Sequence, residues 1–322
     1  HFLVDLNIAR KICDALSEGV RPGTSAGESA PADMAGNAGA GADTRVGTDG
    51  CADAGVGSLN GGGAGLAAGA DARIAADTTA AGAPAAAEAG RGGAVPCDVL
   101  EVGCGMGVLT QFLLRRGDIT TYGAEIDPES VEYLHAHFPE FAPRLIEGDF
   151  LKMNLRERFP RGLKIIGNFP YNISSQIFFK VLEHRDLVPE CVGMIQKEVA
   201  VRIAEPPGSK EYGILSVLLQ AWYDIEYLFT VNETVFNPPP KVKSAVIRLR
   251  RNSVGRLGCD EALFVKVVKA SFGQRRKMIR NSLRAVFGDF GGAEHPFFTQ
   301  RAEQLSVADF VQLTDWVAAN RK

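Results

Sequence analysis

The chain has 322 residues, 46% of them hydrophobic, and a formal net charge of −3, which is ordinary for a globular protein long enough to form two domains. It contains no run of 18 apolar residues and begins with neither the charged region nor the cleavage site of a signal peptide, so we expect no membrane span and a cytoplasmic protein. Its six cysteines include no C-x-x-C pair and its five histidines are scattered, which argues against a metal site or a disulfide framework.

The first expected element is an amphipathic helix over residues 5–18, in which Ile8, Ile12 and Leu16 share one face. Residues 22–96 then form a tract of Gly, Ala and small polar residues with very few large apolar side chains. Such a tract cannot bury enough surface to offset the entropy of ordering it. We therefore interpret it as a low-complexity insertion, expected to be disordered, that follows an N-terminal segment of residues 1–21.

Strands and helices alternate from residue 97 onwards, and this is typical of a parallel sheet covered on both faces. Two late strands, 225–231 and 245–249, are expected to form a hairpin-like edge. The other expected strands are 97–102, 120–126, 144–147, 163–167 and 191–195, and the helices between them are 108–116, 128–137, 174–183 and 197–203.

From residue 252 the pattern becomes wholly helical, with helices expected at 260–272, 277–287 and 307–319. Ser306 and Asp309 have the spacing of a helix cap at the start of the last one. The sequence thus predicts an α/β fold with a Rossmann-like sheet domain over 97–251 and a small all-helical domain over 252–322.

The segment Glu101–Gly107, with the sequence EVGCGMG, stands where a strand gives way to a helix. Glycines such as Gly103 and Gly105 let the backbone turn tightly and approach a ligand closely. The dinucleotide fingerprint G-x-G-x-x-G would need its third glycine at the position of Val108, so this fingerprint is absent. Glu125 ends the next strand, where a carboxylate can accept ribose hydroxyls, and Asp149 follows the third strand. These residues predict a nucleoside cofactor; the alternative is a tight structural turn with surface acids.

The tetrapeptide Asn168-Phe169-Pro170-Tyr171 follows the strand expected at 163–167. Ligands of open α/β sheets bind beyond the carboxyl ends of the strands, so we expect it beside the cofactor. The Asn168 side chain and the Pro170 backbone carbonyl can accept the two amino hydrogens of an adenine, which aims the N6 lone pair at a methyl donor. Tyr171 offers a flat face for an extruded base. The alternative is a proline-terminated strand with a buried tyrosine.

Positive charge is concentrated late in the chain, because residues 241–284 contain thirteen Lys and Arg but only two acids. Outside 22–96 the chain carries 32 basic and 30 acidic residues, so the net negative charge comes from the insertion. A charge run is usually a solvated face, but this local excess favours contact with RNA phosphates. The candidate RNA-binding residues are Lys241, Lys243, Gln274, Arg275, Arg276, Lys277 and Arg280.

Taken together, these segments resemble the small-subunit ribosomal RNA adenine N6,N6-dimethyltransferases. The resemblance covers nearly everything except 22–96, and Cys104 stands where this family commonly has proline. The insertion has no counterpart in the family, and its acids would repel RNA if they lay near the substrate face. The matching stretches are 1–3, 101–107, 167–174, 196–199, 236–246, 272–277 and 279–283.

The resemblance implies that the chain is a Rossmann-like methyltransferase that uses S-adenosylmethionine. His1 and Leu3 would close over this cofactor, Gly103 would approach its amino-acid end, and Asn168 would contact both its edge and the target N6. Glu125 would bind its ribose and Asp149 its adenine, Gly105 would complete the cofactor site, and Asn168, Pro170 and Tyr171 would be the catalytic residues.

The resemblance also implies a substrate, namely two adjacent adenines in a loop near the 3′ end of small-subunit rRNA. A 30S assembly intermediate would be the partner of a monomeric enzyme. A large-subunit rRNA adenine methyltransferase of the antibiotic-resistance type would share this chemistry. A non-catalytic RNA-binding assembly factor with the same fold and a DNA adenine methyltransferase are also compatible with these motifs.

Overall fold

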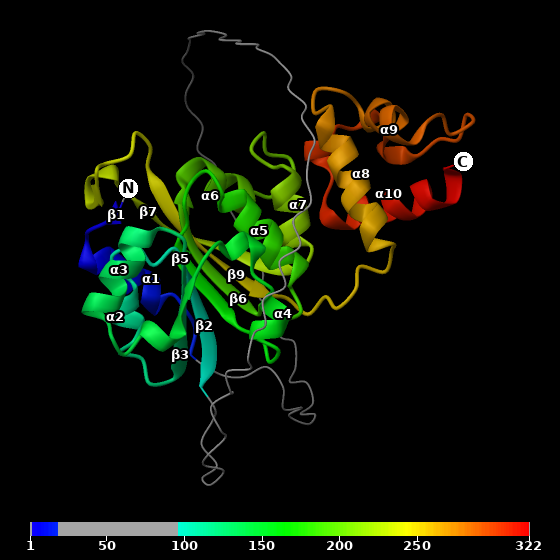
Figure 1. Ribbon diagram of the computed structural model, residues 1–322. Coiled ribbons are helices and arrows are strands. Elements are labelled where there is room, and N and C mark those ends of the chain that lie inside the picture. The colour runs from blue at the N-terminus through cyan, green and yellow to red at the C-terminus, as the bar shows by residue number, and fades with distance from the viewer. Residues whose placement is uncertain (1, 19–95, 322) are drawn as a thin grey trace, which may run out of the picture. The chain divides into compact units, whose positions relative to one another are not determined.

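The computed structural model describes residues 2–18 and 96–321, all within one compact unit (Figure 1). The expected cofactor contact of His1 lies outside the described residues, and so does nearly all of the 22–96 insertion. In the described ranges, no helix has the length and apolar character required to cross a membrane.

A mixed sheet of seven strands forms the centre of this unit, in the order β4-β3-β2-β5-β6-β9-β7. The first five strands in this order run parallel, and β9 pairs antiparallel with both β6 and β7. The expected parallel sheet with a hairpin at one edge is therefore confirmed. The bounds are β2 Cys97–Val102, β3 Ile119–Glu125, β4 Leu145–Glu147, β5 Lys164–Asn168, β6 Glu190–Gln196, β7 Tyr223–Val231 and β9 Ser244–Arg251.

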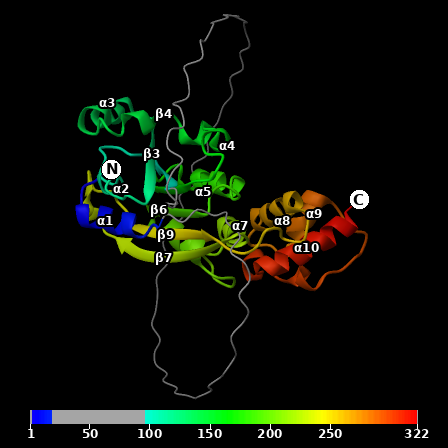
Figure 2. The ribbon, with the colours of Figure 1, turned by 90° about the horizontal axis from the view of Figure 1, so that it is seen from below.

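Both faces of the sheet are buried because successive side chains of a strand point to opposite faces. Val99 and Ile166 pack with the N-terminal helix α1 (Leu6–Asp14) and with α2 (Thr110–Leu113). Their neighbours Leu100 and Ile165 belong to a larger core on the other face. Figure 2 shows α1 and α5 on opposite sides of the sheet.

Helix α1 ends at Asp14, four residues before the expected end. The residues that follow form hydrogen bonds with the sheet instead of a further helical turn. The Ser17 hydroxyl donates to Glu190 at 2.5 Å, and the Lys164 ammonium donates to the carbonyls of Ser17 and Glu18. Lys164 and Glu190 are buried and 3.1 Å apart. Removing either partner would leave a buried charge unpaired.

The remaining helices that cover the sheet agree with expectation, apart from three differences. The expected helix 108–116 is reduced to α2, while α4 (Leu155–Arg158) and α7 (Ile214–Gln220) were not predicted. Helix α7 begins after an N-cap glycine, Gly213, and no acid or base in its end turns signals its bounds. The others are α3 Pro128–His137, α5 Ser174–Glu183 and α6 Lys197–Ala204.

Three helices follow the sheet as expected, namely α8 (Glu261–Gly273), α9 (Ile279–Phe287) and α10 (Val307–Asn320). Ser306 and Asp309 form the predicted capping box of α10. In Figure 1 these helices gather beside α7, and their buried residues belong to the same core as those of α7. The domain boundary at residue 252 stays a prediction.

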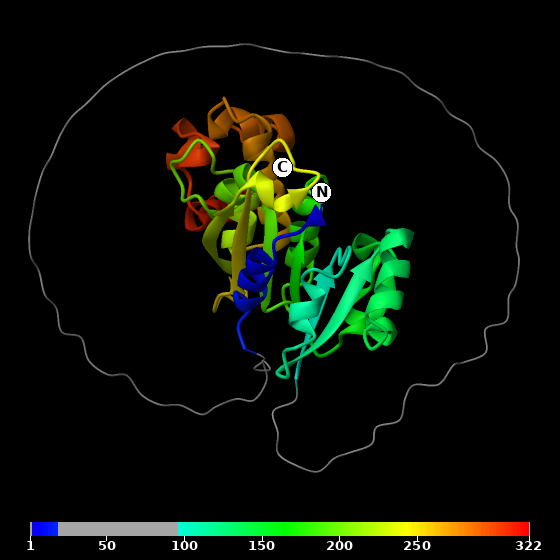
Figure 3. The same cartoon turned by 90° about the vertical axis from the view of Figure 1, so that its left-hand side faces the viewer.

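A short strand at the N-terminus, β1 (Phe2–Leu3), pairs antiparallel with β8 (Phe236–Asn237). Figure 3 shows the two strands side by side near the N-terminus. The sequence did not predict this pairing. It joins the N-terminal segment to the stretch before β9, next to the glycine-rich turn.

Candidate functional site

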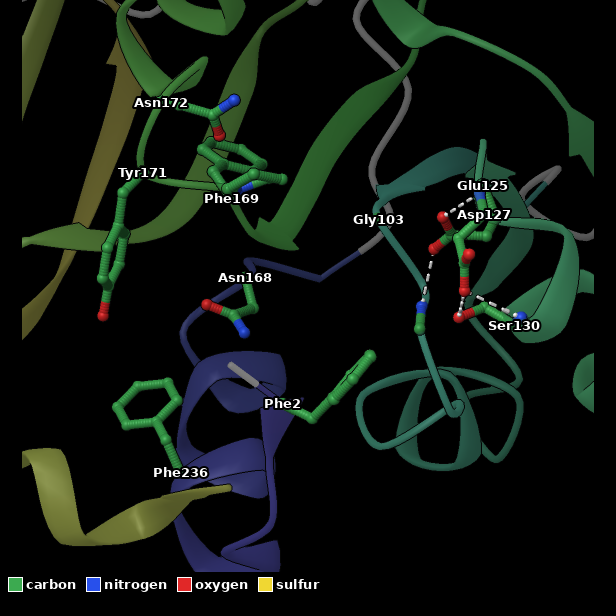
Figure 4. A pocket seen from close by; sticks show the side chains of 12 residues that line it. Phe2, Gly103, Glu125, Asp127, Ser130, Asn168, Phe169, Tyr171, Asn172 and Phe236 are labelled. Carbon is green, nitrogen blue, oxygen red and sulfur yellow. Dashed lines mark hydrogen bonds between the residues drawn. The ribbon is translucent and has the colours of Figure 1, made fainter. Parts of the chain in front are cut away.

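A cavity of about 490 Å³ opens at the carboxyl ends of β2, β3 and β5, where open α/β sheets bind their ligands. In Figure 4 Asn168 lies between Tyr171 and Phe236 on one side and Glu125 on the other. A volume of this order suits a ligand of nucleoside size or larger. The lining residues are Phe2, Gly103, Gly105, Glu125, Asp127, Ser130, Asn168, Phe169, Pro170, Tyr171, Asn172 and Phe236.

The glycine-rich turn has the backbone shape that only glycine adopts readily, with φ of +75° at Gly103 and +52° at Gly105. A Cβ added at Gly103 would lie 3.9 Å from both the Asn168 backbone oxygen and the Pro170 Cδ. The positive φ therefore favours glycine at position 103, whereas a side chain there would not clash with its neighbours. The same two distances show that the turn lies directly against the Asn168–Tyr171 segment.

Glu125 ties this turn to the end of β3. Its Oε2 accepts the Gly105 N–H at 2.8 Å, and its Oε1 accepts the N–H groups of Ile126 and Asp127 at 2.8 and 2.9 Å. A carboxylate offers about four acceptor positions, so Oε2 retains one toward the cavity. The residue can thus order the turn and accept one hydroxyl of a ligand.

A second carboxylate, Glu101, is buried beneath the turn with 1% of its surface exposed. Burial raises the pKa of Glu101 to about 8, the Thr110 hydroxyl that donates to it at 2.6 Å lowers that pKa, and the nearby charge of Glu125 raises it. The sequence placed Glu101 in the glycine motif without a role. The structure makes it the internal support of the turn.

Two more polar residues line the cavity at the start of α3. Asp127 caps this helix, because its carboxylate accepts the Ser130 N–H at 3.0 Å and the Ser130 hydroxyl at 2.6 Å. These hydrogen bonds hold the pKa of Asp127 below its ordinary value. Sequence reasoning did not select either residue, although the Asp-Pro-Glu-Ser pattern is a recognisable helix start.

Two expected cofactor contacts lie away from the lining of this cavity. Asp149 caps a short turn, and its Oδ1 accepts the Leu151 N–H at 2.9 Å. Leu3 is buried and lines a small neighbouring hollow together with Gly103 and Asn168. Their roles toward the cofactor stay predictions.

The segment after β5 is held by the ring of Phe169, which is buried against two glycines. A Cβ at Gly167 would lie 2.9 Å from this ring, and a Cβ at Gly193 of β6 only 2.5 Å from it. The two missing side chains therefore create the slot that anchors the segment. Sequence reasoning expected a stacking tyrosine here but overlooked this anchor.

Asn168 is the last residue of β5, and its side chain projects into the cavity (Figure 4). Within residues 2–18 and 96–321, its amide group forms no hydrogen bond, so both its carbonyl and its NH₂ are available. The Pro170 carbonyl accepts the Ile173 N–H at 3.1 Å. One lone pair remains on that oxygen, because a carbonyl has two.

Two aromatic side chains form the far wall of the cavity. Tyr171 is half-buried, and its phenol lies 2.6 Å from the Ser244 hydroxyl. Phe236 is buried and comes from β8, whereas Phe2, which pairs with the next residue Asn237, is 47% exposed. Phe2 packs over Gly105, where a Cβ would lie 3.3 Å from its ring. Neither phenylalanine was selected from the sequence, because two-residue strands carry no periodic signal.

The candidate RNA-binding residues fall into two groups. Lys241, Lys243, Gln274, Arg276 and Lys277 are exposed. Arg275 instead donates to the carbonyls of Lys210 and Tyr212, and Arg280 pairs with Glu294. Some of the candidate RNA-binding residues therefore stabilise the fold through contacts within the protein.

The residues around the cavity fit a nucleoside cofactor. The turn presents bare backbone because glycine occupies both of its lining positions, and a carboxylate with a spare acceptor position stands at the next strand end. Within the ranges that the structure describes, no cluster of three or more metal-ligating side chains was found.

Comparison with known proteins agrees with this geometry. The family described as "Ribosomal RNA adenine dimethylase" matches residues 96–319. The chain is 61% identical over 218 residues to the "Ribosomal RNA small subunit methyltransferase A" of Parabacteroides distasonis, a match that covers 67% of this chain and 81% of that protein. The protein of the same name from Porphyromonas gingivalis is 59% identical over 220 residues, covering 67% and 84%.

Among solved structures, the chain is similar to a dimethyladenosine transferase from Plasmodium falciparum. The TM-score is 0.58 at 25% identity, and the match covers 69% of this chain and 90% of the other. The chain therefore belongs to the ribosomal RNA adenine dimethylase family, a group of Rossmann-like methyltransferases that use S-adenosylmethionine.

Proposed function

We propose that this enzyme dimethylates N6 of two adjacent adenines in a loop near the 3′ end of small-subunit rRNA, and that it acts as a monomer on a 30S assembly intermediate. The name shared by its relatives supports the choice of subunit. The observation that carries the chemistry is the Asn168 amide, which projects into the cavity beside Gly103.

The residues proposed to hold the cofactor are Gly103, Gly105 and Glu125, with Asp127 and Ser130 at the same wall. When bound, S-adenosylmethionine supplies an electrophilic methyl group on a sulfonium sulfur. The N–H-bonded Glu125 carboxylate keeps the turn open and retains one acceptor position for a ribose hydroxyl. The bare backbone of the glycines lets the ligand approach closely.

The target amino group is proposed to lie between two carbonyl oxygens. An adenine N6 is a poor nucleophile because its lone pair is delocalised into the ring. The Asn168 side-chain carbonyl and the spare lone pair of the Pro170 carbonyl can accept its two hydrogens, which turns the lone pair toward the Gly103 side of the cavity. The methylated ammonium is acidic and loses its proton to water, so no general base is required.

The aromatic wall is proposed to receive the base. Tyr171 and Phe236 present flat apolar surfaces at one side of the cavity, and stacking on such surfaces offsets the free energy of extruding a base. An adenine in a single-stranded loop is extruded at lower cost than one in a duplex. Exposed Lys241, Arg276 and Lys277 are proposed to contact the phosphates.

Methyl transfer from labelled S-adenosylmethionine tests the substrate. The enzyme is given undermethylated small subunits, large subunits or DNA, and the product nucleoside is identified. We expect dimethyladenosine only in small-subunit rRNA, and loss of label with Asn168→Ala while RNA binding persists. Equal labelling of large subunits would refute the subunit assignment, and label on DNA would favour a DNA methyltransferase. RNA binding without label would favour a non-catalytic assembly factor.

A further inference from the structure

A second open hollow lies between α8 and α9, apart from the cavity at the strand ends. It has a volume of about 530 Å³, and its lining includes Lys266, Lys269 and Gly273 from α8 with Ala285 and Val286 from α9. The spacing from Lys266 to Lys269 and Gly273 places all three on one face of α8. We call this hollow the α8–α9 groove.

The floor of the α8–α9 groove is mainly apolar and made of small side chains, with Ser282 and Gln274 as its polar lining residues. Ala270 and Ala285 contribute single methyl groups, and a Cβ added at Gly273 would meet no atom within 4 Å. Val286 is 60% exposed although it is a large apolar residue. Such a floor has room for a flat ring, and covering Val286 would remove apolar surface from water.

The rim of the groove is cationic. Lys266 and Lys269 are both exposed, and none of the described residues that line the groove is acidic. An apolar floor of small side chains beneath two ammonium groups has the chemistry of a nucleotide site, in which the base covers the floor and phosphates pair with the lysines. An acidic peptide would match the charge but would not by itself cover the apolar floor.

An aromatic side chain of α5 lies beside the rim of the groove. The Lys269 Nζ lies 5.7 Å from the centroid of the Phe179 ring, which is 37% exposed. Phe179 belongs to α5, which begins at Ser174, three residues after Tyr171. At 1.5 Å per residue, Phe179 stands about 8 Å along this helix from its start.

We propose that the α8–α9 groove binds one unstacked nucleotide of the rRNA substrate, with its base on the floor and its flanking phosphates on Lys266 and Lys269. The proposal rests on the proposed function, since it assigns a second contact for the same RNA. It fixes the RNA at a point away from the methylated adenine. RNA binding is therefore measured apart from methyl transfer.

The first test removes the charges. Binding of fluorescent, undermethylated small-subunit rRNA is followed by anisotropy over a range of salt concentrations. The double variant Lys266→Ala/Lys269→Ala is expected to raise Kd at low salt roughly tenfold and to reduce the slope of log Kd against log salt by about 1.4, as expected for two single-strand phosphate contacts. The control Lys11→Ala/Arg158→Ala removes two exposed charges elsewhere and should leave both quantities unchanged.

The second test fills the floor. Ala285→Trp occupies the groove, while Ala318→Trp places the same ring at an exposed position on α10. With rRNA that contains 4-thiouridine, photocrosslinks to peptides of α8 and α9 are expected in the wild type and in Ala318→Trp, and at least fivefold fewer in Ala285→Trp. Circular dichroism verifies that each variant is folded.

Three outcomes would overturn the nucleotide site. Unchanged Kd and crosslinks in both groove variants would show that RNA does not use the groove. Weaker binding to whole small subunits with unchanged binding to naked rRNA would assign the groove to a protein. A Kd that changes with the charges but not with Ala285→Trp would reduce it to a phosphate contact. Failure of the proposed function would instead appear as absent methyl transfer by the wild type.

Discussion

The phenolic oxygen of Tyr171 lies 2.6 Å from the hydroxyl of Ser244, which is fully buried at the start of β9. Ser244 is paired in register with Gln196 of β6 and Val231 of β7. This hydrogen bond therefore fixes the Tyr171 ring relative to the buried interior of the sheet, although Tyr171 itself lies in a turn.

Replacing Ser244 by Ala should loosen the Tyr171 ring without removing it. We expect kcat to fall about tenfold, because the ring would sample positions unsuited to stacking on the base, while cofactor affinity stays unchanged. Steady-state kinetics with rRNA and calorimetric titration of cofactor measure both. Ser244→Thr keeps the hydroxyl and should restore kcat; a Thr variant as slow as the Ala variant would contradict this positioning role.

Gly193→Ala tests the slot beneath Phe169. The added methyl would collide with a buried ring, so we expect the free energy of unfolding to fall by about 1–3 kcal/mol and activity to drop as the Asn168 segment shifts. Chemical denaturation and methyl transfer measure these effects. Trimming the ring in Gly193→Ala/Phe169→Leu should recover stability. Gly255→Ala, at a position with open space around it, is the control and should change neither quantity.

Glu101 makes a pH-dependent contribution to stability. Its folded pKa of about 8 lies above its ordinary value of 4.5, so between these pH values the folded state holds a proton that the unfolded state has lost. The free energy of unfolding therefore declines as pH rises through that window, by about 1.4 kcal/mol for each pH unit. Glu101→Gln, which can still accept from Thr110, should gain stability relative to wild type from pH 5 to pH 8 in denaturant titrations. A constant difference would contradict the raised pKa.

The candidate RNA-binding residues should fall into two functional groups, one that binds RNA and one that stabilises the fold, as their contacts in the structure indicate. Arg276→Ala/Lys277→Ala removes exposed charges and should raise KM for rRNA and lower the salt slope of RNA binding by about 1.4. Arg280 pairs with Glu294 and lies over the Phe298 ring, so Arg280→Ala should mainly lower the melting temperature. Binding titrations and thermal melts on the same preparations separate these effects. A larger salt effect from Arg280→Ala would reverse the assignment.

Local patterns made much of this molecule predictable. The apolar strands before Gly103 and Asn168 have short, clear ends, and a parallel sheet brings such ends together. The strand pattern therefore predicted the fold correctly, and the motifs at these ends predicted the family and the cofactor correctly. The pairing of Phe2 with Asn237 could not be predicted, because it joins two short segments far apart in the sequence. The ion pair between Arg280 and Glu294 was likewise hidden, since charge counts do not reveal which side chains meet.

The described residues that flank 19–95 on both sides lie at the amino ends of the central strands, opposite the cavity. Lys164, the first residue of β5, donates to the Glu18 carbonyl at 2.9 Å. Pro96 precedes Cys97, the first residue of β2, and parallel strands begin at one common edge. The proposed catalytic residues lie at the other ends of these strands.

Excising residues 19–95 should therefore preserve catalysis. A Gly/Ser linker of about ten residues spans roughly 18 Å on average, enough to join two points that both adjoin the amino ends of β2 and β5. We expect kcat, KM for rRNA and cofactor affinity within about twofold of the parent, because the buried Lys164–Glu190 pair still anchors the end of the N-terminal segment. Residues 19–95 contain eight Asp and Glu but four Arg, so a large gain in rRNA affinity upon excision would show instead that these acids repel the substrate.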